Sequence, residues 1–398
     1  MADPTQTPPP TDLTDRMLYE TGDPEALYAR LRRQAPVWRQ RDTDGNTFHA
    51  VLRHRDILTA YTDTATFSSV NGIRIGADTT AVDYAAHKML IVSDPPVHAH
   101  LRRAISRTLT PEVLRSLAAR LDRHIGQLFE QALCADAVDL VHDIARPISQ
   151  TVICDLLGVP PTDRAHLVDL TTQAFEAGEE NTRRAANTEI FLYFDDLLDQ
   201  HRSRPPESGR PTVMSLLAHS ELDHDTAVLN CSGLLSGGNE TTRHVLSAGT
   251  LALARHPGQF ARLTTDAALT DPAVEELLRY TSPAVYVLRT VTRPVTLAGT
   301  HFAKGDRVAL WNASGNRDED VFPDPDHLLL DRTPNRHLGF GQGRHICIGA
   351  RFARLEIATY LGHLRTRVRA LQVAGPPRWN GSNFARGLTS LPIRLVPR

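Results

Sequence analysis

The amino-acid sequence predicts a mainly α-helical fold with a minor β portion, organised as a single large domain. Three observations carry this prediction. Apolar residues recur with helical spacing along most of residues 97–280. Short β-prone segments are found only near the two ends of the chain. Residues 225–255 have the pattern of one helix of roughly 30 residues, about 45 Å long, which is enough to cross a whole domain.

The N-terminal part is predicted to contain a tail, a helix, a hairpin and a long loop. Residues 1–22 begin with a Pro-rich stretch and are expected to be a flexible tail, so that the domain spans 23–398. The Asp-Pro pair at 23–24 is typical of a helix start. Turn-forming residues 42–46 separate two β-prone segments and predict a β-hairpin. Residues 70–90 contain few periodic apolar positions and are expected to form a long loop, of the kind that often covers a pocket.

Helices fill the middle of the sequence, and short strands follow them. The expected helices lie at about residues 97–108, 111–133, 139–157, 162–178, 183–203, 225–255, 272–280 and 350–368. The expected strands lie at residues 285–291, 295–297 and 308–311. The Pro- and Gly-containing segment 204–211 is interpreted as a connecting loop, because helical patterning resumes directly after it. We expect the late strands to share a sheet with the N-terminal hairpin, which would join the two ends into one unit.

Composition and charge exclude several classes of protein. The 398 residues are 41% hydrophobic and 23% charged, as in ordinary globular proteins. With 44 Lys and Arg against 46 Asp and Glu, the net charge of −2 gives no electrostatic reason to expect a nucleic-acid or anionic-lipid partner. No stretch approaches the ~18 uninterrupted apolar residues of a membrane span, and the first residues lack the pattern of a secretory signal. We therefore expect a cytoplasmic protein that does not contact membranes.

The four cysteines are far apart, which does not fit a disulfide framework. Cys134, Cys154 and Cys231 have helix-like apolar neighbours and are expected to be buried thiols. Cys347 lies instead in the segment FGQGRHICIG (residues 340–349), directly before the last predicted helix. The three glycines there allow positive φ and close approach of a flat ligand, and a helix N-terminus stabilises a thiolate. A thiolate facing a planar cofactor is what haem iron needs for cysteine ligation; the alternative is a buried structural cysteine in a Gly-rich turn.

At this segment the sequence resembles the cytochrome P450 family, whose signature F-G-x-G-x-H-x-C-x-G is matched at every fixed position. The resemblance extends from about residue 23 to the end of the chain. It implies a P450-like fold in which haem b lies between the long central helix and the helix after the cysteine. It also implies that Cys347 is the axial ligand of the haem iron and that His345 binds a haem propionate. Phe340 would shield the sulfur, and Gly349 would complete the cofactor-binding loop.

A second motif, GGNETT at residues 237–242, lies in the middle of the long helix. Two adjacent glycines inside a helix cost about 2 kcal/mol relative to alanine, so their presence needs a reason. One explanation is close helix packing, with Thr241 bonding back to a carbonyl one turn earlier. The P450 resemblance implies another. Gly238 would contact the cofactor, and the glycines would allow a local π-bulge. Glu240 and Thr241 would then act as the acid and the alcohol that deliver protons to dioxygen.

Two further motifs match the resemblance in the expected order. Glu276 and Arg279 share a helix face at i, i+3 and, by resemblance, form a buried structural ion pair that supports the cysteine loop together with a downstream segment. His98 and Arg102, in DPPVHAHLRR, are one turn apart. With Arg289 they match positions that bind the haem propionates. Each of these residues alone would more commonly be a solvated surface charge.

The substrate pocket is expected to be lined by the loop at 70–92, by the long helix, by the strand that follows residue 284 and by the C-terminal turn. The side chains expected to line it are Leu234, Leu235, Val285, Val287 and Phe384. These side chains are apolar, so the expected substrate is a small organic molecule held chiefly by burial.

Basic residues flank the cysteine loop and predict a docking surface for a redox partner. They are Arg102, Arg103, Arg107, Arg115, Arg336, Arg344, Arg351 and Arg354. We expect them to bind an acidic ferredoxin near the iron, with electrons supplied by an NAD(P)H-dependent ferredoxin reductase. A solvated charged face is the alternative.

The sequence thus predicts a monomeric haem-thiolate monooxygenase that uses O2 to hydroxylate or epoxidise a natural-product biosynthetic intermediate. The first alternative is a P450-type enzyme that catalyses oxidative coupling, cyclisation or nitration, and nothing in the sequence separates these reactions from hydroxylation. The second is a haem-thiolate sensor or electron carrier without catalysis, which the presence of Glu240 and Thr241 argues against. The third is a zinc protein, but the 18 His lack the paired Cys/His spacing of a zinc site.

Overall fold

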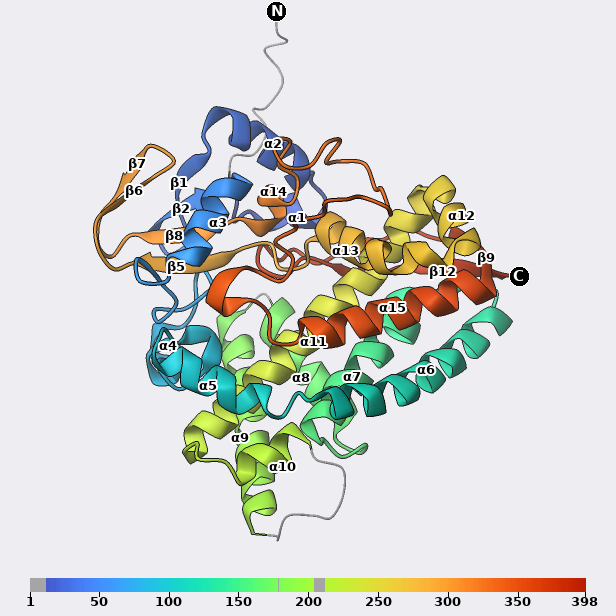
Figure 1. Ribbon diagram of the computed structural model, residues 1–398, viewed down its shortest axis with the longest axis horizontal. Coiled ribbons are helices and arrows are strands. Elements are labelled where there is room, and N and C mark those ends of the chain that lie inside the picture. Colours follow the sequence, from blue (N-terminus) through green and yellow to red (C-terminus); the bar gives the residue numbers. More distant parts are fainter. Residues whose placement is uncertain (1–11, 178, 204–211) are drawn as a thin grey trace, which may run out of the picture.

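The computed structural model describes residues 12–177, 179–203 and 212–398 (Figure 1). The helices of the first half are α1 (Arg16–Glu20), α2 (Pro24–Gln34), α3 (His54–Thr62), α4 (Thr79–Ala85), α5 (Val97–Ser106), α6 (Pro111–Cys134), α7 (Arg146–Leu157), α8 (Arg164–Glu176) and α9 (Glu180–Arg202). Those of the second half are α10 (Val213–Ala218), α11 (His224–Arg255), α12 (Pro257–Thr265), α13 (Thr270–Thr281), α14 (Asn312–Gly315) and α15 (Ala350–Arg367).

The strands are shorter and cover much less of the chain. They are β1 (Val37–Arg41), β2 (Thr47–Val51), β3 (Phe67–Ser68), β4 (Val138–Asp139), β5 (Val287–Val291), β6 (Val295–Leu297), β7 (Thr300–Phe302), β8 (Arg307–Leu310), β9 (Val368–Val373), β10 (Arg378–Trp379), β11 (Leu388–Ser390) and β12 (Pro392–Pro397). The predicted mainly α fold with a minor β portion is confirmed.

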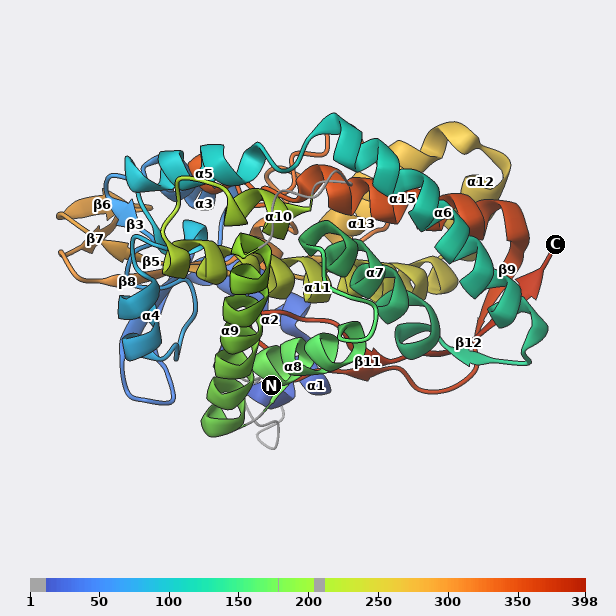
Figure 2. The same ribbon diagram turned by 90° about the horizontal axis from the view of Figure 1, so that it is seen from below.

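Helix α11 runs through the middle of the molecule, with α7, α9, α13 and α15 packed against it (Figures 1 and 2). The side chain of Asp223 accepts a hydrogen bond from the N–H of Thr226 at 2.9 Å and fixes the start of the helix. Pro257 begins the next helix. Residues 242–253 are all buried, as expected of a helix that is covered around its whole circumference. A single large hydrophobic core surrounds this part of α11.

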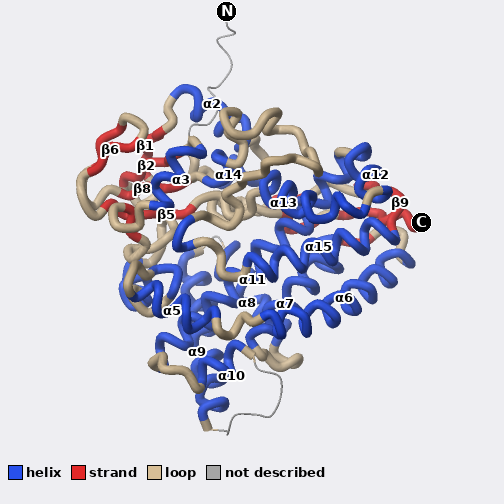
Figure 3. Tube along the Cα trace, in the orientation of Figure 1, coloured by secondary structure: helices blue, strands red, loops and turns tan. Residues whose placement is uncertain are grey.

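The main sheet joins the two ends of the chain. Its strand order is β1-β2-β8-β5-β3. Strands β1 and β2 form the predicted antiparallel hairpin, and β2 pairs in parallel with β8 in the register His49↔Val308. A second sheet, β4-β12-β9, places the C-terminal strands beside residues 138–139. The predicted sharing of one sheet by the hairpin and the late strands is confirmed for β5 and β8, whereas β6 pairs with β7 in a separate two-stranded sheet. Figure 3 shows strands at two edges of a helical body.

The structure corrects the prediction for the N-terminal segments. Residues 12–22 are part of the fold and not of a tail, because Asp15 caps α1 and both Leu18 and Tyr19 are buried. Residues 1–11 lie outside the described residues. The segment expected to be a loop at 70–90 contains α4, whose N-cap Asp78 accepts a hydrogen bond from Thr80 N at 2.9 Å.

Two predictions in the middle of the chain are also corrected. The helix expected at 139–157 is a π-helix (Leu140–Ala145) followed by α7, because Pro147 has no N–H to continue a helical ladder and instead begins a new helix. Cys134 is exposed, since it is the last residue of α6, whereas Cys154 and Cys231 are buried as predicted. The predicted loop at 204–211 lies outside the described residues. Among the residues that the structure describes, no helix combines the length and apolar character needed to span a membrane.

Candidate active site

The loop before α15 holds Cys347 in a conformation that depends on glycine. Gly341 and Gly343 have φ of +65° and +69°, which residues with a side chain rarely adopt. A Cβ added to Gly343 would lie 2.6 Å from the carbonyl oxygen of Tyr61, so only glycine allows the loop to approach α3 this closely. The N–H of Cys347 donates a hydrogen bond to the carbonyl of Phe340 at 2.8 Å and closes the loop.

Cys347 lies deep among protein atoms and yet keeps accessible surface. A side chain that is both surrounded and accessible faces a space inside the fold. Burial raises the pKa of the thiol, whereas the N–H of Gly349 and the guanidinium groups of Arg102 and Arg354 oppose this rise. These donors and cations favour the thiolate, which is the form that binds a metal.

Phe340 is fixed between the cysteine loop and the first turn of α15. The guanidinium carbon of Arg354 lies 4.5 Å from the centroid of its ring. Arg354 in turn donates two hydrogen bonds to the carboxylate of Glu275 in α13, at 2.6 and 2.8 Å. The ring therefore has a defined position next to the backbone of Cys347, which is compatible with the shielding role that the sequence predicts.

Four basic side chains from distant segments converge beside the cysteine loop. They are His98 and Arg102 of α5, Arg289 of β5, and His345. The ring centroids of His98 and His345 are 4.2 Å apart. Burial lowers the pKa of all four groups, and in His345 burial together with Arg289, His98 and Arg102 lowers the pKa to about 3. The structure thus brings the predicted propionate-binding residues together, and two of them, Arg102 and Arg289, are guanidinium cations that lack a carboxylate partner among the described residues.

The protein itself provides little negative charge for this cluster. Asp94 faces it, but its carboxylate already accepts hydrogen bonds from the hydroxyl of Ser68 and, at 3.1 Å, from the N–H of Ser69. The Nε2 atom of His98 is buried without a hydrogen-bond partner among the described residues. An open surface depression of about 400 Å³ adjoins the cluster and is lined in part by His98, Arg102 and Arg344. Buried cations are stable only when paired, so these residues fit a buried dianion such as the two propionates of haem.

The middle of α11 has a strip of accessible surface, although the helix crosses the interior. The strip contains Leu234, Gly237, Gly238 and Thr241. The hydroxyl of Thr241 donates to the carbonyl of Gly237 at 2.9 Å, as expected from the packing explanation of the motif. A Cβ added to Gly237 would meet no atom within 4 Å, whereas one added to Gly238 would lie 2.7 Å from Cδ1 of Ile153.

One prediction for this motif is corrected and another stays a prediction. A Cβ at Gly237 would enter open space and one at Gly238 would press on α7, but Gly238 itself keeps accessible surface, so its contact with the cofactor stays a prediction. The predicted π-bulge is not formed, since α11 is α-helical throughout His224–Arg255.

Glu240 is fully buried and points away from the accessible strip. Its carboxylate pairs with Arg243 and accepts hydrogen bonds from Nδ2 of Asn239 at 2.9 Å and from Thr172 of α8 at 3.5 Å. Successive helical residues point in directions about 100° apart, so the acid and the neighbouring alcohol do not share a face. The sequence predicts a proton-delivering pair, and the structure separates its two members in this conformation.

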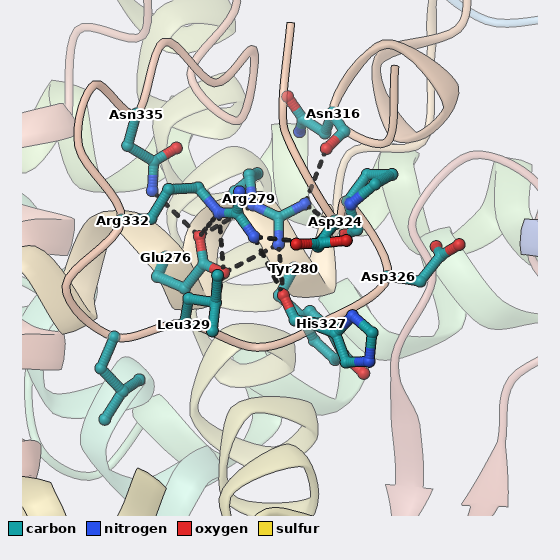
Figure 4. Close-up of polar contacts among 12 residues, drawn as sticks. Glu276, Arg279, Tyr280, Asn316, Asp324, Asp326, His327, Leu329, Arg332 and Asn335 are labelled. Atoms are coloured by element: carbon teal, nitrogen blue, oxygen red, sulfur yellow. Dashed lines mark hydrogen bonds and ion pairs between the residues drawn. The ribbon is translucent and has the colours of Figure 1, made fainter. Parts of the chain in front are cut away.

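Glu276 and Arg279 form the predicted ion pair, and both side chains are fully buried. The Nε and Nη2 atoms of Arg279 each donate to a different oxygen of Glu276 at 2.8 Å. Arg332 and Asn335 also donate to this carboxylate, each at 3.1 Å (Figure 4). Further N–H groups of the two arginines donate to backbone carbonyls within residues 316–327. The network ties α13 to the segment that leads into the cysteine loop.

The side chains expected to line a substrate pocket fall into two groups. Leu234, Val287 and Phe384 are partly accessible and remain candidates. Leu235 and Val285 have no accessible surface, because each packs within a hydrophobic core. The prediction that these two residues line a pocket is wrong.

Two residues of the site were not predicted. Ser69 lies with its hydroxyl 3.2 Å from Nε2 of His345, but a single serine in a loop carries no sequence signal. Arg243 pairs with Glu240 at the i, i+3 spacing that also joins Glu276 to Arg279, so the same spacing rule would have identified it.

Comparisons with known proteins agree with this geometry. The family model described as cytochrome P450 matches residues 167–367. Cytochrome P450 NovI of Streptomyces niveus is 34% identical over 397 residues, which cover 97% of this chain and 96% of NovI. Linalool 8-monooxygenase of Pseudomonas putida is 33% identical over 406 residues, with coverage of 97% and 99%.

Solved structures give the same result. The structure of P450 OxyD, which is involved in the biosynthesis of vancomycin-type antibiotics, superposes with a TM-score of 0.88 at 34% identity and covers 98% of this chain and 100% of OxyD. Sequence relatives, solved structures and the cysteine-loop geometry all point to one family. The chain therefore belongs to the cytochrome P450 family, the haem-iron monooxygenases.

Proposed function

We propose that this P450 binds haem b through Cys347 and oxidises a small organic substrate, by hydroxylation or epoxidation, in a cytoplasmic natural-product pathway. Electrons come from NAD(P)H through a ferredoxin reductase and a ferredoxin. The observation that carries the proposal is the convergence of His98, Arg102, Arg289 and His345 beside the thiol of Cys347. When bound, haem supplies an iron whose thiolate ligand favours O–O cleavage.

The residues of the site have separate tasks in this proposal. The thiolate of Cys347 holds the iron, and the basic cluster holds the propionates through charge-assisted hydrogen bonds. At Gly237 the accessible strip of α11 has open space that the cofactor and substrate would share, and the hydroxyl of Thr241 on the same strip would donate protons there. Leu234, Val287 and Phe384 provide apolar surface that binds the substrate and excludes water.

Relatives with named roles support a biosynthetic substrate. OxyD, the structural neighbour described above, is involved in the biosynthesis of vancomycin-type antibiotics. PksS of Bacillus subtilis, a cytochrome P450 of the bacillaene polyketide synthase, superposes with a TM-score of 0.87 at 27% identity and covers 97% of this chain and 99% of PksS. Both neighbours belong to biosynthetic systems, and the apolar side chains of the present site are suited to an organic intermediate of that kind.

Product analysis tests the proposed reaction. Haem-loaded enzyme, ferredoxin, reductase and NADPH are incubated with candidate biosynthetic intermediates under isotopically labelled O2, after a screen for compounds that displace the iron-bound water. The proposal expects a product that contains one oxygen atom from O2. Compounds that displace the water but are never oxygenated would contradict it.

Thr241→Ala is expected to lower the amount of product formed per O2 consumed by about a hundredfold. The variant removes the hydroxyl that the accessible strip presents, and a positioned proton donor contributes about 10²–10⁴-fold to such reactions. The measurement is the ratio of product to O2 consumption. Thr241→Ser keeps the hydroxyl and should stay close to wild type. An alanine variant with wild-type coupling would show that Thr241 Oγ1 delivers no proton.

The basic residues around the cysteine loop support docking of an acidic ferredoxin. Arg103, Arg107, Arg336, Arg344 and Arg351 are exposed and have no ion pair or hydrogen bond to any described side chain. The paired members of the predicted set are Arg115, which binds Glu112, and Arg354, which binds Glu275. Unpaired arginines are available to a negatively charged partner.

Charge reversal at Arg103 or Arg344 is expected to raise the apparent KM for ferredoxin about tenfold and to leave the affinity for substrate unchanged. The reason is loss of electrostatic attraction at the docking surface, so the effect should shrink at high salt. Arg378→Glu is the control, because Arg378 is exposed on β10, whose partner β11 lies on the opposite side from α5 in Figure 2. If substrate binding weakens while the KM for ferredoxin stays constant, this surface does not dock ferredoxin.

A further inference from the structure

Arg74 lies in the segment that runs beside strand β5. The carbonyl of Ile73 accepts a hydrogen bond from Leu288 N at 2.8 Å, and the N–H of Ile75 donates to the hydroxyl of Tyr286 at 3.0 Å. These two bonds hold the backbone on both sides of Arg74. The residue is therefore fixed next to the part of β5 that carries Val287, one of the partly accessible apolar candidates.

The guanidinium of Arg74 lies over an aromatic ring and has no other partner in the described part of the chain. Its carbon is 5.5 Å from the centroid of Phe384, which packs edge-on against Tyr286 with centroids 5.4 Å apart. No hydrogen bond or ion pair joins Arg74 to any described residue. Burial lowers the pKa of its guanidinium and the nearby Arg183 acts in the same direction, whereas Tyr286 and Glu180 act against this change. Arg183 itself is already paired with Glu180.

Most buried or partly buried arginines of this protein have a carboxylate partner. Examples are Arg32 with Glu319, Arg279 with Glu276, Arg307 with Asp42, Arg317 with Asp326 and Arg386 with Glu25. Arg102 and Arg289, which lack one among the described residues, belong to the basic cluster that fits haem propionates. Arg53 donates instead to the carbonyl of Arg32 at 3.2 Å. Arg365 also lacks one, and it lines a groove at the surface between α6 and α15. A cation–π contact offsets only part of the desolvation of a guanidinium, so a partly desolvated guanidinium is better explained by an anion that arrives with a ligand.

Neighbouring residues of the segment 69–89 show where Arg74 lies relative to the basic cluster and to α11. Ser69, which contacts His345, precedes Arg74 by five residues, so the two lie at most about 18 Å apart. On the other side, Ile73 and Met89 pack in a small cluster with Leu229 of α11. A Cβ added to Gly233 of α11 would lie 2.3 Å from Cε of Met89, so this loop covers α11 immediately before the accessible strip. Arg74 is thus on the side of the site where the substrate is proposed to bind.

We infer that Arg74 binds an anionic oxygen group of the substrate, a carboxylate or a phosphate, while the apolar part of the substrate lies along the accessible strip of α11. This inference rests on the proposed function and specifies the substrate as an organic acid or phosphate ester. The planar fork of arginine matches the two oxygens of such a group and binds it through two parallel hydrogen bonds. The ring of Phe384, whose centroid lies 5.5 Å from the guanidinium carbon, gives the fork a flat surface to pack against.

Probes that ligate the iron can measure the preference for an anionic over a neutral ligand without knowledge of the natural substrate. Imidazolyl alkanoates, the matching imidazolyl alkanols and the phosphate esters of those alkanols, each in a series of chain lengths, are titrated into haem-loaded enzyme. Binding is followed by the Soret shift that imidazole ligation causes. At one chain length the wild type should bind an anionic probe at least about tenfold more tightly than the alcohol, and the series with the larger preference identifies a carboxylate or a phosphate.

Arg74→Gln should abolish the preference and leave the affinity for the alcohol within about twofold of wild type, which also shows that the variant is folded. Arg184→Gln is the matched control, because Arg184 is exposed and already paired with Asp78 at 2.8 Å, and it should keep the preference. Two results would overturn this inference while leaving the proposed function intact. One is equal binding of anionic and neutral probes by the wild type at every chain length. The other is an unchanged preference for the anionic probe in Arg74→Gln. If even the alcohols cause no Soret shift in the wild type, the haem site itself is contradicted, and the inference falls with it.

Discussion

Cys347→Ser is expected to abolish substrate oxidation and to remove the red-shifted Soret band of the reduced carbon monoxide complex. A serine hydroxyl is not ionised near neutral pH and does not donate electron density to iron as a thiolate does. The variant should still fold, because the bond from the backbone N–H of residue 347 to the carbonyl of Phe340 does not involve the side chain. The basic cluster is also unchanged, so haem should still be incorporated. Product assays and absorption spectra of the purified variant check this expectation.

A matched control is available in the same chain. Cys134 is an exposed thiol at the end of α6, and Cys134→Ser should leave both the spectrum and the activity at wild-type levels. A Cys347→Ser enzyme that keeps the red-shifted band would mean that another residue holds the iron. Loss of the band in Cys134→Ser would lead to the same conclusion.

Glu276→Ala is expected to lower the free energy of unfolding by about 3–5 kcal/mol. The substitution removes one carboxylate and leaves two buried guanidinium groups, those of Arg279 and Arg332, without their anion. It should also reduce haem incorporation. Arg279 donates to the carbonyl of Asn316, and Oδ1 of Asn316 accepts a bond at 2.6 Å from the N–H of Leu338, two residues before the cysteine loop begins.

Denaturant unfolding and the ratio of Soret to protein absorbance measure the two effects. The control is Glu112→Ala, which breaks an exposed ion pair with Arg115 at the same i, i+3 spacing and should leave both values near wild type. Glu276→Gln keeps the hydrogen-bonding oxygen but not the charge and should fall between alanine and wild type. If Glu276→Ala unfolds at the wild-type midpoint and binds haem fully, the network has no structural role.

Sequence alone predicted the features that depend on local periodicity and spacing. The long helix α11 follows from its apolar pattern and from Pro257, which starts the next helix. The pairing of β2 with β8 follows from the β-prone segments at the two ends of the chain, whose backbone groups need hydrogen-bond partners. The glycines around Cys347 were predicted to have a backbone role, and Gly341 and Gly343 do have positive φ. Each of these properties is set by residues close together in the chain or by a fixed motif.

Other features depend on contacts between distant residues and were not predictable from local pattern. Gly237 and Gly238 are equivalent in a sequence motif, and only the packing of Ile153 against one of them shows which is open. Glu240 turns toward Arg243 and α8 because that side is buried and supplies donors. Leu235 differs from Leu234 only in facing the core instead of the accessible strip. One position along a helix changes the direction of a side chain by about 100°, and the tertiary fold decides which direction is the interior.

The central claim is that Cys347 ligates a haem iron as a thiolate, and the spectrum of the reduced carbon monoxide complex tests it most directly. Wild-type protein purified with its haem, reduced and exposed to carbon monoxide, is predicted to show the red-shifted Soret band of thiolate ligation. Intact holo-protein whose Soret band stays unshifted under these conditions would contradict the assignment of Cys347 and the function built on it.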